Sequence, residues 1–218
     1  HPESPRAQRT YAHTLALAGM TKEALLELDQ AYERFPNDIS IPVISMGVSC
    51  KTGLPLRYDF VELTASVGRH RLTDGLRPAL QELVNGFSDS SCAYMVERAQ
   101  HFIAELQNLP GATQTSRAGF FALQGDLALQ QGDLFSALVA FAAIDEMHPS
   151  VDSALRLTGH YLRMREFGMA LQWLDTAEGR ANTEGFSTAR TRDFSKQRES
   201  IERLSEMARR ASEGTLGR

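Results

Sequence analysis

The chain has 218 residues, of which 42% are apolar, and this is enough to bury a core in one large domain or two small ones. This composition excludes a disordered tail. The 27 acidic residues outnumber the 23 Lys and Arg residues, so the formal net charge is −4 and no global positive field exists to hold nucleic acid. We therefore expect no nucleic-acid partner.

The chain starts at His1-Pro2-Glu3 without a methionine, which predicts a processed product or a piece of a longer protein. Its most apolar stretch, residues 135–144, is about half of the roughly 20 residues that span a bilayer. We expect no membrane insertion by this stretch, although an anchor that precedes His1 would be consistent with the sequence.

Small and apolar residues recur in a frame of about 34 residues. In segment 5–37 the frame contains Ala12, Leu15, Gly19, Ala24, Leu28, Ala31 and a closing Pro36. The same offsets from residue 118 give Gly125, Ala128, Gly132, Ala137, Phe141, Ile144 and Pro149. From residue 151 they give Thr158, Tyr161, Arg165, Ala170, Leu174 and Ala177, with Asn182 in place of the proline.

The residue types fit pairs of antiparallel helices. Two helices cross closely only where side chains are small, as expected for Ala12 with Ala24. Gly19 lies where a left-handed cap would end the first helix, and Pro36 lies where the second helix must stop. The second copy has Gly125 with Ala137 for the crossing, and Gly132 and Pro149 for the two ends.

This spacing resembles the tetratricopeptide repeat, a 34-residue helix–turn–helix unit. The resemblance implies an all-α fold, a right-handed α-α superhelix of about five helix pairs plus a C-terminal capping helix. We expect residues 1–218 to form a single domain. Its predicted parts are a repeat at 5–38, divergent helix pairs at 39–112, repeats at 118–151 and 151–184, and a capping helix at 187–211.

In the divergent segment the helices are predicted from periodicity alone. Their expected ranges are 41–51, 58–67, 74–87 and 91–106. Gly47 is expected at a close helix crossing, and Pro78 is tolerable only in the first turn of its helix. Pro110-Gly111 is the best candidate for a subdomain boundary, but one continuous array is favoured.

The last predicted helix carries an apolar stripe on an otherwise charged surface. The stripe consists of Phe194, Ile201, Leu204, Met207 and Ala211. The favoured interpretation is a capping helix that covers the end of the last repeat. An amphipathic helix that binds a partner is the alternative.

Motifs of catalysis and metal binding are absent from the sequence. The histidines lack the spacing of a zinc protease, the glycines form no phosphate-binding loop, and no serine lies in a nucleophile elbow. A cluster of Asp145, His148, Ser150, Asp152 and Ser153 is better explained by a helix start that Ser150 or Asp152 caps. We expect no enzyme activity, no cofactor and no metal.

The two cysteines, Cys50 and Cys92, lack C-x-x-C spacing. The favoured interpretation is two buried thiols on helices, since free cysteine behaves as a small apolar residue. A disulfide is the alternative if they meet in an oxidising compartment.

The resemblance also implies a ligand groove lined by the first helix of each pair. Carried over position by position, its charged and polar members are Arg6, Arg9, His13, Asp126, Gln130, Asp152 and Arg163. Arg9 and Arg163 are expected to position carboxylates or backbone carbonyls of the ligand. The family's clamp for chaperone tails uses Lys and Asn where this chain has Arg9 and His13, so that function is not carried over.

The sequence therefore favours a non-catalytic module that binds a protein or peptide along its groove. The alternative is a soluble accessory domain of a larger bacterial membrane protein, for example one that handles surface or lipid-linked glycans. The opening His1-Pro2-Glu3-Ser4-Pro5-Arg6-Ala7 resembles the start of soluble repeat regions in polytopic bacterial membrane proteins. Under the alternative the domain would be periplasmic, and otherwise cytoplasmic.

Overall fold

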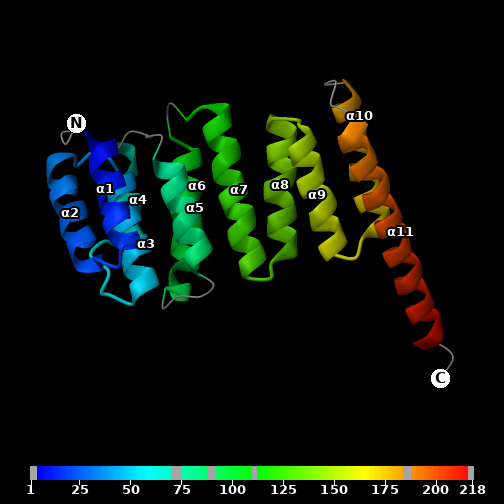
Figure 1. The fold of residues 1–218 in the computed structure, drawn as a ribbon, viewed down its shortest axis with the longest axis horizontal. Coiled ribbons are helices and arrows are strands. Elements are labelled where there is room, and N and C mark those ends of the chain that lie inside the picture. The colour runs from blue at the N-terminus through cyan, green and yellow to red at the C-terminus, as the bar shows by residue number, and fades with distance from the viewer. Residues whose placement is uncertain (1–3, 70–74, 88–91, 110–111, 184–187, 216–218) are drawn as a thin grey trace. The chain divides into compact units, whose positions relative to one another are not determined.

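The computed structural model describes residues 4–69, 75–87, 92–109, 112–183 and 188–215 (Figure 1). Within these ranges every regular element is a helix, which confirms the predicted all-α fold class. The elements are α1 (Pro5–Leu17), α2 (Thr21–Arg34), α3 (Ser40–Thr52), α4 (Phe60–Ser66), η1 (Val67–Arg69), α5 (Leu76–Phe87), η2 (Ala93–Met95), α6 (Val96–Gln107), α7 (Gln114–Gln130), α8 (Leu134–Met147), α9 (Val151–Arg163), α10 (Phe167–Thr183) and α11 (Thr188–Thr215).

Along these ranges α1 to α10 follow one another as five helix pairs, and α11 comes last. The order agrees with the predicted number of pairs and with the predicted terminal helix. The expected helix starts at residues 74 and 91 lie outside the described residues. No helix within the described residues is long and apolar enough to cross a bilayer.

The helix ends are determined locally by capping residues. Ser4 accepts a hydrogen bond from the Ala7 amide at 3.1 Å, and Ser150 forms a reciprocal capping box with Ser153 at the start of α9. The predicted cap at Ser150 is thereby confirmed. Gly19 and Gly132 have φ values of +80° and +75°, the left-handed conformation predicted for both.

Arg165 takes the equivalent position in the third frame and also has a positive φ, at +60°. An L-residue with a Cβ is strained in this region of the backbone map. The chain therefore keeps the geometry of the turn after α9 even though the glycine is missing.

The chain folds as two compact units, unit 1 from His1 to Gln131 and unit 2 from Gly132 to Arg218. The division lies between α7 and α8, inside the repeat predicted at 118–151. The alternative boundary at Pro110-Gly111 lies outside the described residues. A single domain over residues 1–218, and the crossing of Gly125 with Ala137, both remain predictions.

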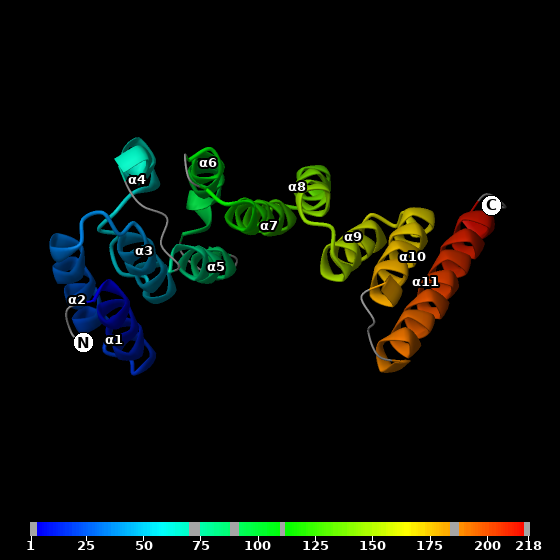
Figure 2. The same cartoon turned by 90° about the horizontal axis from the view of Figure 1, so that it is seen from above.

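Unit 1 has two rows of helices. α1 packs on α2 and α2 on α3, after which α3, α5 and α7 pack in sequence, while α4 packs on α6 (Figure 2). Ala12 and Ala24 are both fully buried where α1 packs on α2, as their small size predicts. The divergent segment instead packs large side chains, such as Phe60 against Phe102 with ring centroids 5.2 Å apart.

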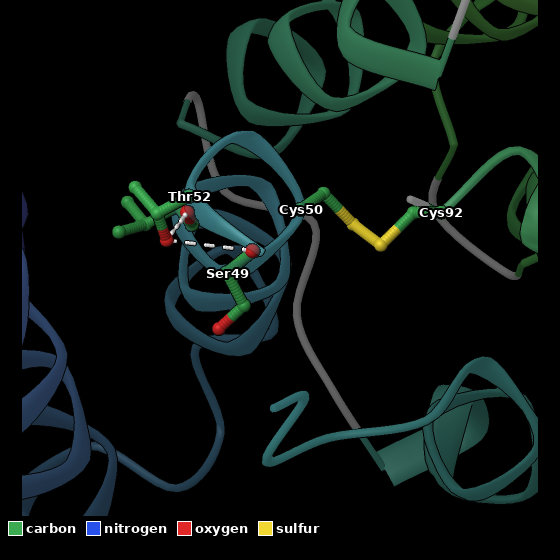
Figure 3. The surroundings of a disulfide bond; sticks show 5 residues. Ser49, Cys50, Thr52 and Cys92 are labelled. Atoms are coloured by element: carbon green, nitrogen blue, oxygen red, sulfur yellow. Dashed lines mark hydrogen bonds between the residues drawn. A yellow bond between two sulfur atoms is a disulfide. The ribbon is translucent and has the colours of Figure 1, made fainter. Parts of the chain in front are cut away.

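A disulfide bond joins Cys50 on α3 to Cys92, the residue before η2 (Figure 3). Their Cα atoms are 5.5 Å apart although the two cysteines lie 42 positions apart in the sequence. The favoured interpretation of two unpaired thiols is therefore wrong, while the expected burial is correct, with 2% and 3% of each residue exposed. The sequence could not show the pairing, because it depends on the tertiary packing of unit 1.

Unit 2 packs α8 on α9, α9 on α10 and α10 on α11. Its core is built largely from alanines: Ala154, Ala170, Ala177 and Ala181 are at most 1% exposed. Helix α11 buries Phe194 and Ile201, whereas Leu204 and Met207 are 45% and 66% exposed. The predicted capping role therefore holds for the first half of α11, and the second half leaves its apolar stripe in contact with solvent.

Candidate functional site

A hollow of about 100 Å³ lies between α1, α3 and α5 in unit 1. These helices are the first members of the first three pairs, the elements that the sequence places along the groove (Figure 2). The wall residues are His13, Ala16 and Leu17 from α1, Ile44, Gly47, Val48, Lys51 and Thr52 from α3, and Ala79 and Glu82 from α5.

Gly47 leaves the space that forms this hollow. A Cβ atom built on Gly47 would meet no heavy atom of a neighbouring segment within 4 Å. The prediction that Gly47 allows a close helix crossing is therefore wrong. Because any larger residue would project a side chain into this space, the glycine keeps the hollow open beside Ile44 and Val48.

Charged side chains form the rim of the hollow. Glu82 accepts a hydrogen bond from Lys51 Nζ at 2.6 Å, and His13 Nδ1 lies 3.7 Å from the other carboxylate oxygen. All three side chains remain about half exposed, so their mutual attraction adds little to stability. The arrangement is an apolar floor with a mixed-charge rim, which is the usual composition of a recognition site.

The first repeat supplies three of the predicted groove residues, with different surroundings. His13 is the one that lines the hollow. Arg6 is exposed on α1. Arg9 is only 12% exposed, and its guanidinium donates to the Asp38 carboxylate at 2.7 Å and to the Ser40 hydroxyl. Arg9 thus links α1 to the start of α3, and its predicted role in ligand binding remains a prediction.

Two further predicted residues lie on α7 and face α5. Asp126 accepts a hydrogen bond from Gln81 Nε2 at 3.4 Å, and Gln130 Nε2 donates to the Val84 carbonyl at 2.9 Å. They connect neighbouring first helices of the row. Asp152 and Arg163 belong to α9 in unit 2, where both are exposed.

The predictions missed Lys51, Glu82 and the opening at Gly47, since the repeat frame was not extended through the divergent segment. The spacing of residues in the sequence does contain a signal for these positions. Gly47 lies 34 residues after His13, and Glu82 lies 35 residues after Gly47. The groove-facing position therefore continues at the repeat spacing even where the small-residue pattern has been lost.

A second hollow of about 550 Å³ lies between α4 and α6. Phe60, Val61 and Thr64 of α4 face Arg98 and His101 of α6 there. Arg98 is already paired with Asp59, the N-cap residue of α4, at 2.7 Å. This hollow is formed by second helices of the pairs, outside the predicted groove.

The polar cluster around Asp145 is a structural network in unit 2. Arg180 of α10 donates to both carboxylate oxygens of Asp145, at 2.9 Å for Nη2 to Oδ2, and to the Ser150 carbonyl at 2.8 Å. The Ser153 hydroxyl donates to the same carboxylate at 2.6 Å. The hydrogen bond from Arg180 is the main reason that the pKa of Asp145 lies below its ordinary value, although burial opposes it.

His160 is buried beside Phe141, and it is only 2% exposed. Its Nε2 lies 2.7 Å from the Leu134 carbonyl, so this nitrogen carries a proton and donates. Burial lowers the pKa of His160, because the charged imidazolium would lose its solvation. The ring thus ties α9 to the first residue of α8 as a neutral group.

Within the described residues, no three His, Cys, Asp or Glu side chains are grouped as ligands of a metal ion would be. The polar clusters of both units are instead explained by helix caps, helix-to-helix hydrogen bonds and the rim of the hollow.

No known family model matches the chain, and no curated protein matches it either. Solved structures that resemble it include TTC0263, a thermophilic tetratricopeptide-repeat protein of Thermus thermophilus, which is 16% identical over 91% of this chain and 98% of that chain, with a TM-score of 0.47. PilF of Pseudomonas aeruginosa is 16% identical over 93% of this chain and 91% of that chain, with a TM-score of 0.50. At this identity the likeness to PilF concerns the fold alone.

Proposed function

We propose that this chain, which has a tetratricopeptide-like helical-repeat fold, is a non-catalytic interaction module that binds an extended segment of a partner protein or peptide. The ligand lies over the hollow between α1, α3 and α5. The observation that carries this proposal is the open space at Gly47, a buried helical glycine with no neighbour for its missing side chain. Well-packed interiors leave few such spaces, so an unfilled one at a groove-facing position favours a ligand.

In this proposal an apolar ligand side chain enters beside Gly47 and contacts Ile44 and Val48. The rim residues Lys51 and Glu82 then hydrogen-bond with polar groups of the ligand next to that side chain. Most of the affinity comes from the buried apolar contact, because exposed ion pairs contribute little.

The other predicted residues of unit 1 extend the groove in the same proposal. Arg6 and His13 act from α1, and Asp126 and Gln130 act from α7. Asp152 and Arg163 on α9 stay predicted ligand-binding residues of unit 2, taken by itself. Arg9 stays a proposed groove residue of α1, and its bonds with Asp38 and Ser40 also position α1 against α3.

The experiment starts from a selection of random linear peptides on the immobilised oxidised chain, followed by titration of a selected peptide against variants. Gly47→Leu should fill the hollow and weaken binding at least tenfold, a difference of about 1.4 kcal/mol. Its melting temperature should not fall below that of the parent chain, because the added Cβ meets nothing and leucine favours helix more than glycine does.

The matched control is Gly179→Leu. Gly179 is also a helical glycine whose added Cβ would meet nothing within 4 Å, but it lies on α10 in unit 2, the second helix of its pair. The control should bind the peptide within twofold of the parent chain. Equal affinity for Gly47→Leu and the parent would exclude this site, and a selection that yields no binding peptide would contradict the proposed function.

One observation supports the alternative function, a soluble accessory domain of a larger bacterial membrane protein. Disulfides persist mainly in oxidising compartments such as the bacterial periplasm, and Cys50 is paired with Cys92. Under this alternative the same hollow recruits a partner outside the cytoplasm. Labelling of the cysteines by a thiol reagent in denaturant immediately after cell lysis tests it, since unfolding exposes both residues and fully labelled cysteines would then indicate a reducing compartment.

A further inference from the structure

The disulfide lies on the same helix that forms the floor of the hollow. Half of the residues that line the hollow come from α3, and Cys50 directly precedes one of them, Lys51. Figure 3 shows Cys50 and Thr52 on different sides of α3, with the disulfide on one side and a wall residue of the hollow on the other. The disulfide is therefore attached to one side of α3, and the other side of α3 would face the ligand.

The second wall of the hollow lies within the loop that this bond closes. Residues 51–91 separate the two cysteines, and they include α5 with its wall residues Ala79 and Glu82. Cys50 and Cys92 belong to one apolar core cluster, to which α5 contributes Leu80 and Leu83. Opening the disulfide would leave the packing of α3 on α5 and the exposed Lys51–Glu82 pair to hold these two helices together.

We propose that ligand binding in the hollow is controlled by the redox state of Cys50 and Cys92. This inference rests on the proposed function, because it concerns the regulation of the same site. A ligand that touches α1, α3 and α5 must find all three helices in their bound arrangement. The disulfide restricts α3 and α5 before the ligand arrives, so the oxidised chain loses less conformational entropy on binding.

The chemistry is thiol–disulfide exchange with a small thiol or a dithiol protein. A thiolate attacks one sulfur of the disulfide and forms a mixed disulfide, and the other cysteine leaves as a thiolate that takes up a proton. A second thiolate of the reductant then attacks the mixed disulfide and releases the remaining cysteine. Two electrons and two protons pass to Cys50 and Cys92, and the reductant leaves as its own disulfide.

Burial makes this exchange depend on the ligand. Both cysteines are almost completely buried, so a reductant reaches them only when the packing around α3 opens. A ligand held across α1, α3 and α5 opposes that opening. Coupling between two sites is reciprocal, so if oxidation tightens ligand binding, the ligand must favour the oxidised form by the same factor.

The test is titration of the peptide selected on the oxidised chain against the oxidised chain, the chain reduced with dithiothreitol, and the Cys50→Ala/Cys92→Ala variant. We expect about tenfold weaker binding for the last two. The temperature is chosen so that all three keep the same far-ultraviolet circular dichroism. Affinities within twofold of one another would overturn the proposal, as would a reduced chain that is unfolded at every temperature.

Two further readouts separate this inference from the proposed function. Hydrogen exchange of the α3 and α5 amides should become faster on reduction while that of α9 stays unchanged, and this needs no ligand. If no peptide is selected, the proposed function fails, and unchanged exchange in α3 would reject the redox control independently. If a peptide binds, its saturation should slow reduction by dithiothreitol, and an unchanged rate would contradict the coupling.

Discussion

The divergent segment of unit 1 and the regular repeat of unit 2 build helix pairs in different ways. Residues 151–184 keep the small-residue spacing, and their helices pack through alanines such as Ala154, Ala170 and Ala177. Residues 39–109 lack that spacing, and their helices pack through large side chains and one disulfide. The chain thus continues as successive helix pairs where the small-residue spacing is lost. There, larger side chains and a disulfide take the place of close helix crossings.

The two units also differ in how they use charge. In unit 2 the Asp145–Arg180 pair is largely buried, and it joins α8 to α10 through several hydrogen bonds. In unit 1 the Lys51–Glu82 pair is exposed at the rim of a hollow. A buried pair stabilises a unique packing, whereas an exposed pair remains available for exchange with a ligand.

The largest expected effect concerns the cross-link. In the Cys50→Ala/Cys92→Ala variant, the unfolding free energy of unit 1 should fall by about 4 kcal/mol, the chain-entropy value for a loop of this size. Trp173, the single tryptophan, is half-buried in unit 2 and reports that unit alone. The urea midpoint should fall more when it is measured by circular dichroism than when it is measured by tryptophan fluorescence. Equal shifts of the two midpoints would contradict separate units.

The buried ion pair should give the next largest effect. Arg180→Met leaves the Asp145 carboxylate without its main partner and should destabilise unit 2 by about 2 to 3 kcal/mol. Arg198→Met is the matched control, since Arg198 pairs with Asp175 and Glu178 at a more exposed position and should cost less than about 1 kcal/mol. Tryptophan fluorescence during urea unfolding measures both, and equal losses would remove the contrast between buried and exposed pairs.

A pH effect should appear in unit 2 through His160. Because burial lowers its folded pKa below the ordinary value of 6.5, the unfolded chain binds a proton at a higher pH than the folded chain does. The stability of unit 2 should therefore fall as the pH drops from about 7 to 5. Asp145, whose pKa is also lowered, loses its contribution only as the pH falls below its ordinary value of 3.8.

His160→Gln tests the assignment, because it removes the titrating ring. The urea midpoint followed by Trp173 fluorescence should then change less between pH 7 and pH 5 than in the parent chain. The same slope in the variant and the parent would assign the pH dependence to another group.

The smallest effect is expected at the turn after α9. Arg165 has a φ of +60°, so Arg165→Gly should relieve the left-handed strain and stabilise unit 2 by about 0.5 to 1 kcal/mol. Gly132→Ala is the opposite test, because it introduces a Cβ at φ +75° and should destabilise by about 1 kcal/mol. Melting temperatures measure both, and a loss of stability in Arg165→Gly would mean that the arginine side chain outweighs the strain.

Much of the fold was predictable because its signals are local. The cap at Ser150, the left-handed glycines Gly19 and Gly132, and the helices of the divergent segment follow from residue types and spacing over a few turns. The candidate site was predictable only in part. His13 lines the hollow, but Arg9 pairs with Asp38, and the roles of Lys51 and Glu82 emerge only once α1, α3 and α5 lie together.

The sequence by itself determined an all-α chain of successive helix pairs, since helix propensity, caps and the 34-residue spacing act between neighbouring residues. Only the tertiary structure decided that Cys50 meets Cys92 and that the space beside Gly47 stays unfilled. It also decided that Leu204 and Met207 extend past the buried half of α11. Each of these depends on which distant side chains approach in space, and residue spacing along one helix carries no such information.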